Sequence, residues 1–143
     1  MSTKILKGIP VSKNIKLSLK ERITKLLDRK VVPTLAAVLV GNDAASEIYV
    51  NSKHKTFIKN SCNSIVHQLE ESISQGELIS LINLLNSDNN IHGILIQLPL
   101  PEHLNEEIVL NTIDPNKDVD GFHPINMGKL LIGSPNFVPC TPQ

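Results

Sequence analysis

The side chains best suited to chemistry lie on a predicted helix that follows an apolar segment. Tyr49 and Lys53 are four residues apart, so on a helix they share one face. Measured from the apolar positions Val50 and Phe57, both lie at the edge of the buried face, whereas Lys55 points away. A lysine amine held at an apolar edge has a lowered pKa, which suits proton transfer near neutral pH. The alternative is a lysine that extends its ammonium into water beside a boundary tyrosine.

Further polar side chains follow other apolar segments. Gln97 ends the run GILIQ, where its amide offers both a donor and an acceptor; the alternative is a solvated or helix-facing glutamine. Asp118 and Asp120 are two residues apart, so in an extended segment both point the same way. An ionised carboxylate can accept two hydrogen bonds from a pterin or a guanidine-like edge. The Asp120-Gly121 pair also favours a turn, and turn chemistry alone is the alternative.

Other chemistries are disfavoured by what the sequence contains. The five histidines show no metal-ligand pairing, and neither a glycine-rich phosphate loop nor a G-x-S-x-G nucleophile motif occurs. Basic and acidic residues both number 14 and aromatic residues make up 3%, so neither nucleic acid nor an anionic membrane is expected as a partner. Two cysteines, Cys62 and Cys140, are too few for a disulfide framework and fit a reduced, cytosolic compartment.

The elements that must position these side chains alternate along the chain. Apolar runs predict strands, helical spacing predicts helices, and Gly, Pro, Asn and Asp mark the breaks between them. Strands are expected at 4–9, 34–40, 64–69 and 91–98, and helices at 11–29, 46–60, 74–87 and 105–113. Ser12 and Asn105 are expected N-caps, and Ser74 with Glu77 matches a capping box. An irregular segment from Pro115, with a brief helix, follows.

Short loops between apolar strands indicate parallel βαβ units. The expected fold is therefore α/β, a three-layer helix–sheet–helix sandwich with a mainly parallel sheet. Ligands of such sheets bind outside the carboxyl ends of the strands. This rule selects the segments 41–55, 97–101 and 117–126, which carry the candidate side chains.

The ordered set of motifs resembles one family along nearly the whole chain, the bifunctional methylenetetrahydrofolate dehydrogenase/methenyltetrahydrofolate cyclohydrolases. The matching segments are AVLVG at 37–41, AS at 45–46, YV at 49–50, KHK at 53–55, GILIQLPLP at 93–101, KDVDGFHP at 117–124 and PCTP at 139–142, with Asn126, Gly128 and Leu130 between the last two. Each motif is modest by itself, but their order and spacing together are specific.

The resemblance implies roles for individual residues. Lys53 would be the essential proton-transfer residue, and Gln97 would be hydrogen-bonded to it and tune it. Tyr49 would stack on the folate and Asp120 would anchor the pterin edge. Leu98 and Pro99 complete the implied set of substrate-binding residues, which contains no metal ligand.

The resemblance also implies an activity and its setting. The family oxidises 5,10-methylenetetrahydrofolate with a nicotinamide cofactor, usually NADP, and hydrolyses the methenyl product to 10-formyltetrahydrofolate. It implies a cytoplasmic homodimer in one-carbon metabolism that supplies purine biosynthesis. A non-catalytic folate-binding module is the alternative function. A related two-domain dehydrogenase acting on an amino acid or shikimate lacks support, because those families do not share the motif set.

One departure from the family pattern is large. The family continues past the PCTP segment into a Rossmann domain that holds the nicotinamide, and a late Gly/Pro-rich segment helps to close its folate site. Neither occurs in these 143 residues. Residues 1–143 are therefore expected to form the tetrahydrofolate-binding catalytic domain, with a linker from about residue 133. The part alone is expected to be inactive or nearly so, and monomeric.

Overall fold

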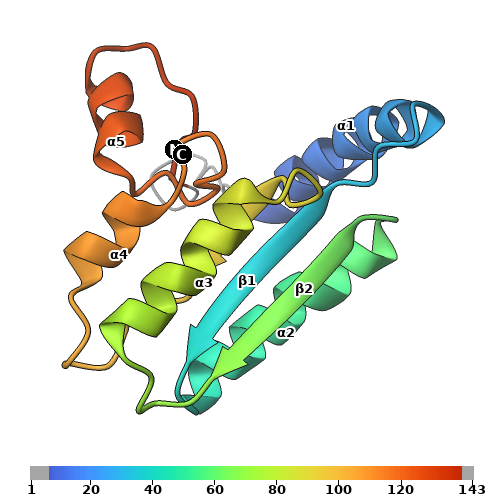
Figure 1. Ribbon diagram of the computed structural model, residues 1–143. Helices are drawn as coiled ribbons and strands as arrows, with labels where there is room; N and C mark the ends of the chain where they lie inside the picture. Colours follow the sequence, from blue (N-terminus) through green and yellow to red (C-terminus); the bar gives the residue numbers. More distant parts are fainter. Residues whose placement is uncertain (1–6, 140–143) are drawn as a thin grey trace, which may run out of the picture.

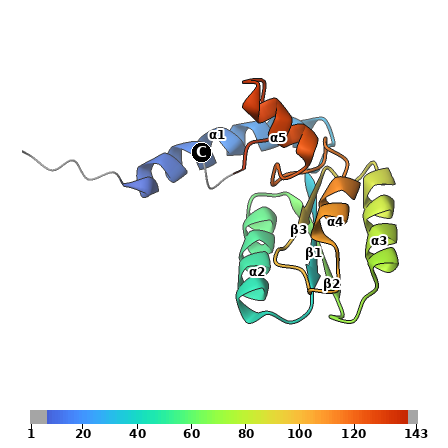
Figure 2. The same cartoon turned by 90° about the vertical axis from the view of Figure 1, so that its left-hand side faces the viewer.

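The computed structural model describes residues 7–139 and contains three strands and five helices within that range (Figure 1). In chain order they are α1 (Gly8–Asp28), β1 (Thr34–Val40), α2 (Ala44–Lys59), β2 (Asn63–Leu69), α3 (Gln75–Ser87), β3 (Gly93–Ile96), α4 (Glu106–Thr112) and α5 (Pro124–Leu131). The strands form one parallel sheet in the order β2-β1-β3. Helix α2 covers one face of the sheet, and α3 and α4 cover the other (Figure 2). The expected three-layer α/β sandwich is confirmed.

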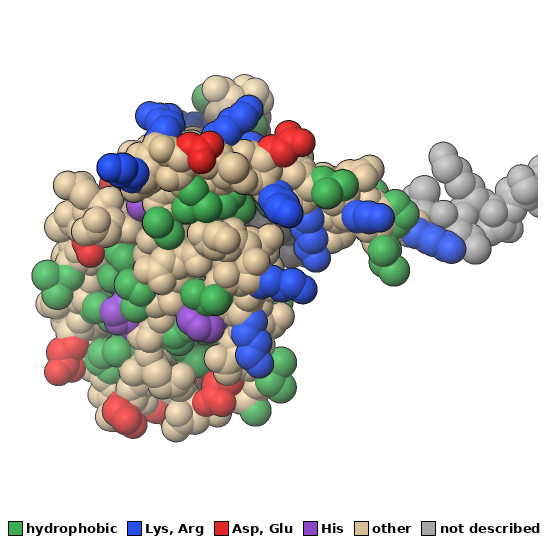
Figure 3. Space-filling model, turned by 90° about the vertical axis from the view of Figure 1, so that its right-hand side faces the viewer, with side chains coloured by type: hydrophobic (Ala, Val, Ile, Leu, Met, Phe, Trp, Pro, Cys, Tyr) green, Lys and Arg blue, Asp and Glu red, His purple; other side chains and the backbone are tan. Residues whose placement is uncertain are grey.

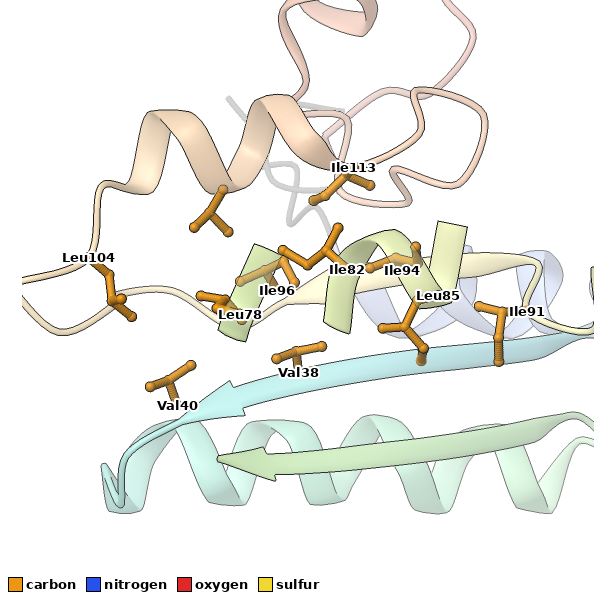
Figure 4. Close-up of a cluster of buried hydrophobic side chains, with 12 residues drawn as sticks. Val38, Val40, Leu78, Ile82, Leu85, Ile91, Ile94, Ile96, Leu104 and Ile113 are labelled. Atoms are coloured by element: carbon orange, nitrogen blue, oxygen red, sulfur yellow. The ribbon is translucent and has the colours of Figure 1, made fainter. Parts of the chain in front are cut away.

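The central strand β1 explains how the two layers of helices are held. All seven of its residues are buried. Successive side chains of a strand point to opposite faces, so β1 supplies a core to each side. Its residues at 36, 38 and 40 pack with α3 and α4, where Leu78, Ile82 and Val109 are fully buried (Figure 4). Its residues at 35, 37 and 39 pack with Val50 of α2 and Leu95 of β3.

The helix starts follow the cap chemistry. The capping box at α3 is confirmed, since Ser74 accepts from the Glu77 amide and the Glu77 carboxylate accepts from the Ser74 amide. The Asn105 cap of α4 is confirmed as well. Helix α2 begins two residues earlier than expected, because the Asp43 carboxylate accepts from the Ser46 amide at 2.8 Å.

The amino-terminal part differs from the prediction. Residues 4–6 of the expected opening strand lie outside the described residues, and Gly8 and Ile9 belong to α1 rather than to a strand. Ser12 is therefore inside the helix and not its N-cap; Lys7 occupies that position without a side-chain hydrogen bond. Helix α1 has no buried residue and projects from the sandwich, with Lys and Arg side chains along it (Figures 2 and 3). Among residues 7–139 no helix is long and apolar enough to cross a membrane.

The edge strand β3 is shorter than the expected 91–98. It ends at Ile96, but the sheet continues beside it, because Asp118 forms a parallel bridge to Ile94. The Ile94 amide donates to the Lys117 carbonyl at 2.7 Å, and the Val119 amide donates to the Ile94 carbonyl at 3.5 Å. The segment that carries the two candidate aspartates therefore lies against the sheet edge.

Candidate active site

The predicted pair on α2 is in contact. The Lys53 ammonium lies 4.1 Å from the centre of the Tyr49 ring, a cation–π geometry. Lys53 is half-buried and Lys55 is exposed, as the helical spacing predicts. Tyr49 is not at a buried edge: 56% of it is exposed, because Val50 alone takes the inward position in this turn. More than half of the Tyr49 side chain is thus accessible to a planar ligand.

Asp120 lies within electrostatic reach of this pair. Burial raises the pKa of the Asp120 carboxyl above its ordinary value, the nearby Lys53 ammonium opposes that rise, and the Asp118 carboxylate adds to it. The fold thus brings together a lysine of α2 and an aspartate of the segment beside β3. A half-buried carboxylate next to an ammonium and an open aromatic ring can bind a flat ligand that carries a hydrogen-bonding edge.

Asp118 has a different environment from Asp120. Only 2% of Asp118 is exposed, and its carboxylate accepts hydrogen bonds from the backbone amides of Gly121, Phe122 and His123 and from the side-chain amide of Asn126. The expectation that both aspartates face the same way as ligand groups is therefore wrong. The chain turns after Asp120, where Gly121 has a φ of +71°, and the turn closes around Asp118.

The same segment is fixed to the body of the domain. The Lys117 ammonium donates to the carbonyls of Leu85, Asn86 and Asp88, at the C-terminal end of α3. Val119 packs so closely on Gly93 that a Cβ at Gly93 would lie 2.5 Å from Val119 Cγ1. Lys117, Val119 and Gly93 therefore fix the segment that carries Asp120.

Gln97 and the two residues after it form the third part of the predicted site. The Gln97 side-chain amide donates to the Leu98 carbonyl at 2.8 Å, while its Oε1 is buried without a hydrogen-bond partner among the described residues. Leu98 is half-buried, Pro99 is exposed, and the bond between them is cis. The expected hydrogen bond between Gln97 and Lys53 is therefore not present, because the Gln97 amide is used by Leu98 and its Oε1 has no partner within residues 7–139.

A cavity of about 350 Å³ lies at the carboxyl end of β1. It is lined by residues that include Gly41, Asn42, Asp43, Glu71 and Pro99. Of the predicted site residues, Pro99 lines it, whereas Lys53 lies nine residues into α2, roughly 14 Å along the helix axis from its start. The strand-end cavity therefore includes Pro99, but the Tyr49–Lys53 contact lies farther along α2.

The helices that follow the strands do not fit the pyrophosphate of NADP. Asp43, Ser74 and Asn105 already accept hydrogen bonds from the amides at the starts of α2, α3 and α4. Acidic side chains, such as Glu77 and Glu106, stand in the first turns of these helices and would repel a phosphate. No group of three or more His, Cys, Asp or Glu within the described part of the chain could hold a metal ion.

Sequence reasoning missed the residues that support the site. His123 caps α5, since its Nδ1 accepts from the Ile125 amide at 3.1 Å, and Asn126 is fully buried. The KDVDG pattern by itself indicates only two carboxylates and a turn. Lys117 gives no local signal either, because the carbonyls that it contacts lie 29 to 32 residues earlier in the chain.

Comparison with known proteins gives one answer. Residues 6–120 match the family model described as tetrahydrofolate dehydrogenase/cyclohydrolase, catalytic domain. The chain is 51% identical over 142 residues to the bifunctional protein FolD of Acetivibrio thermocellus, and 53% identical over 139 residues to that of Campylobacter concisus. The match to the Acetivibrio protein spans 99% of this chain and 50% of that protein, and the match to the Campylobacter protein spans 97% and 49%. The chain thus spans about half the length of the curated relatives it matches.

Solved structures agree. The Campylobacter jejuni bifunctional FolD methylenetetrahydrofolate dehydrogenase/cyclohydrolase superposes with a TM-score of 0.94 at 46% identity, over 99% of this chain and 50% of that one. The Trypanosoma brucei dehydrogenase-cyclohydrolase, solved with NADP cofactor and inhibitor, gives 0.90 at 32% identity, over 99% and 49%. This chain therefore belongs to the tetrahydrofolate dehydrogenase/cyclohydrolase family and matches its catalytic domain.

Proposed function

We propose that this chain is the folate-binding part of an enzyme that oxidises 5,10-methylenetetrahydrofolate with NADP and hydrolyses the methenyl product to 10-formyltetrahydrofolate. The observation that carries the proposal is the contact of Lys53 with the open Tyr49 ring, within electrostatic reach of Asp120. The three side chains together can stack a pterin, hold its edge and move a proton next to it.

Each residue has a role in this proposal. The exposed Tyr49 ring stacks on the folate, and the Asp120 carboxylate accepts hydrogen bonds from the pterin edge. Lys53 transfers a proton during hydrolysis, and the buried Oε1 of Gln97 is the acceptor that orients the substrate. Leu98 and Pro99 contact the substrate beside Gln97.

NADP is bound by a part of the longer protein outside these residues. Two observations support this: the relatives are twice as long, and the helix starts described above are closed to a pyrophosphate. Residues 1–143 then form one domain, with a linker from about residue 133. We further propose that the whole protein is a homodimer, whereas residues 1–143 alone are monomeric. We also propose that the protein is cytoplasmic and supplies one-carbon units for purine biosynthesis.

The test is a pair of lysine variants in the whole protein. Lys53→Met keeps the apolar stem but removes the proton-transfer group, so hydrolysis of methenyltetrahydrofolate is expected to fall about 10²–10⁴-fold. Lys55→Met, two residues away on the exposed side of the same helix, is the matched control and is expected to keep the wild-type rate. Equal rates for Lys53→Met and wild type would exclude Lys53 as the proton-transfer group. Folate binding by the wild type without turnover would favour a non-catalytic module.

A further inference from the structure

The Asp118 carboxylate is fully occupied by its own chain. Its Oδ1 accepts from the amides of Gly121 at 3.1 Å and Phe122 at 3.3 Å. Its Oδ2 accepts from the amide of His123 at 2.9 Å and from Nδ2 of Asn126 at 2.8 Å. A carboxylate has about four acceptor positions, so none remains for a ligand.

All four donors lie beyond Asp120 in the sequence. The carboxylate therefore pulls the following chain back around Asp120 and defines the turn on which that side chain stands. Asn126 closes the turn from the other side, because its Nδ2 also donates to the Pro115 carbonyl at 2.9 Å. Asn126 is completely buried, so this clamp between the loop and α5 is shielded from water.

We propose that Asp118 and Asn126 are a positioning pair, which holds Asp120 in the orientation that binds the ligand. The proposal rests on the proposed function, since it assigns Asp120 to ligand binding. Asp118 acts through the backbone of its turn and not by contact with the ligand. Ligand affinity therefore depends on a carboxylate that the ligand does not touch.

The first experiment is a double-mutant cycle on tetrahydrofolate binding to the whole protein, measured by calorimetry. Asp118→Asn places an amide NH₂ where a carboxylate oxygen now accepts, so the turn loses charge-assisted hydrogen bonds. Binding is expected to weaken about 10–100-fold. In an Asp120→Asn background the same change is expected to have little further effect, because the group that it positions is already altered. An equal loss in both backgrounds would overturn the proposal.

The second experiment needs no ligand. Amide hydrogen exchange of Gly121, Phe122 and His123 is expected to accelerate in Asp118→Asn while the β1 amides stay protected. Asn126→Ser is a milder variant that removes one of the four donors, and it keeps the test open if Asp118→Asn does not fold. The matched control is Asp28→Asn, the same change at an exposed carboxylate at the end of α1.

The two experiments separate this inference from the proposed function. If the wild-type protein does not bind tetrahydrofolate, the proposed function fails, while hydrogen exchange still reports on the turn. If the wild type binds and Asp118→Asn and Asn126→Ser bind equally well, the positioning pair is wrong and the proposed function stands. Unchanged exchange at residues 121–123 in both variants would likewise overturn the pair.

Discussion

The two sides of the candidate site are built in opposite ways. On one side, the segment 117–126 is held by hydrogen bonds that Lys117 and Asn126 donate, by those that the Asp118 carboxylate accepts, and by tight packing of Val119 on Gly93. On the other side, α2 presents Tyr49, which is more than half exposed, in contact with the Lys53 ammonium. The backbone that carries Asp120 is therefore held in place by many contacts, whereas the Tyr49 side chain is largely exposed to solvent.

This difference suggests different roles for the two sides in ligand binding. A preorganised carboxylate loses little freedom when it binds, so it favours a ligand edge of matching geometry. An exposed aromatic ring gains most of its burial only when a ligand covers it. We therefore expect substitutions of the residues that anchor the fixed side, such as Lys117 and Gly93, to change stability most, and substitutions on the α2 side to change binding and turnover with little effect on stability.

The largest effect on stability is expected for Lys117→Met. Its ammonium donates to three carbonyls at the end of α3, and methionine leaves them without that donor. The free energy of unfolding should fall by about 3 kcal/mol, the upper range for hydrogen bonds to a charged group. Urea denaturation measures this. Lys59→Met, at an exposed position of α2, is the control; an equal loss there would show that the three contacts contribute nothing specific.

Gly93→Ala is expected to cause the second largest loss of stability. The new Cβ would lie 2.5 Å from Val119 Cγ1, so the segment that carries Asp120 must move. Overpacking of this kind costs about 1–3 kcal/mol. Thermal unfolding of the single variant and of Gly93→Ala/Val119→Ala tests the cause. The double variant should recover part of the stability, and a purely additive loss would contradict the steric explanation.

Asp120→Asn is expected to stabilise the domain slightly at neutral pH while it weakens folate binding. The pKa of Asp120 in the folded protein is raised, chiefly by burial, so ionisation of this group opposes folding. Below the ordinary Asp pKa both chains are neutral at this position and equally stable. The advantage of the variant should appear as the pH rises through the folded-state pKa. Melting curves across the acid range show it; a variant that is less stable at neutral pH would contradict the assigned cause.

The smallest effect on stability is expected for Tyr49→Leu. The ring is mostly exposed, so its loss should cost at most about 1 kcal/mol, the usual size of a cation–π contact at the surface. Folate affinity should fall more clearly, because a leucine offers no ring face. Tyr49→Phe keeps the ring and should bind nearly as well as wild type. Binding that is unchanged in both variants would remove Tyr49 from the site.

Much of the fold could be predicted because its signals are local. The apolar run at 34–40 coincides with β1, and the Ser74–Glu77 and Asn105 caps coincide with helix starts. The early start of α1 could not be predicted, since Gly8 and Pro10 read as breakers although a proline fits a first helical turn. Strand β3 is shorter than expected because the chain turns toward Pro99 after Gln97. The Gln97 amide still donates to the Val38 carbonyl of β1, but it is the last one to do so in this segment.

The site was harder to predict than the fold. The spacing of Tyr49 and Lys53 correctly predicts their contact, because both lie on one helix. The difference between Asp118 and Asp120 depends on the turn at Gly121 and on Asn126, and alternation along an extended strand gives no hint of it. The role of Lys117 depends on carbonyls about thirty residues earlier in the chain, which no local pattern shows.

The contact of Lys117 with the end of α3 has a consequence for the order of folding. The hydrogen-bonded atoms belong to residues separated by 29 to 32 positions, and β3 and α4 lie between them. Such a contact can form only after the intervening chain has closed its loop, and the entropy of that closure must be offset by packing already in place. We therefore expect α3, β1 and β3 to assemble first and the Asp120 turn to form late, so that the binding surface is completed only on a sandwich that is already folded.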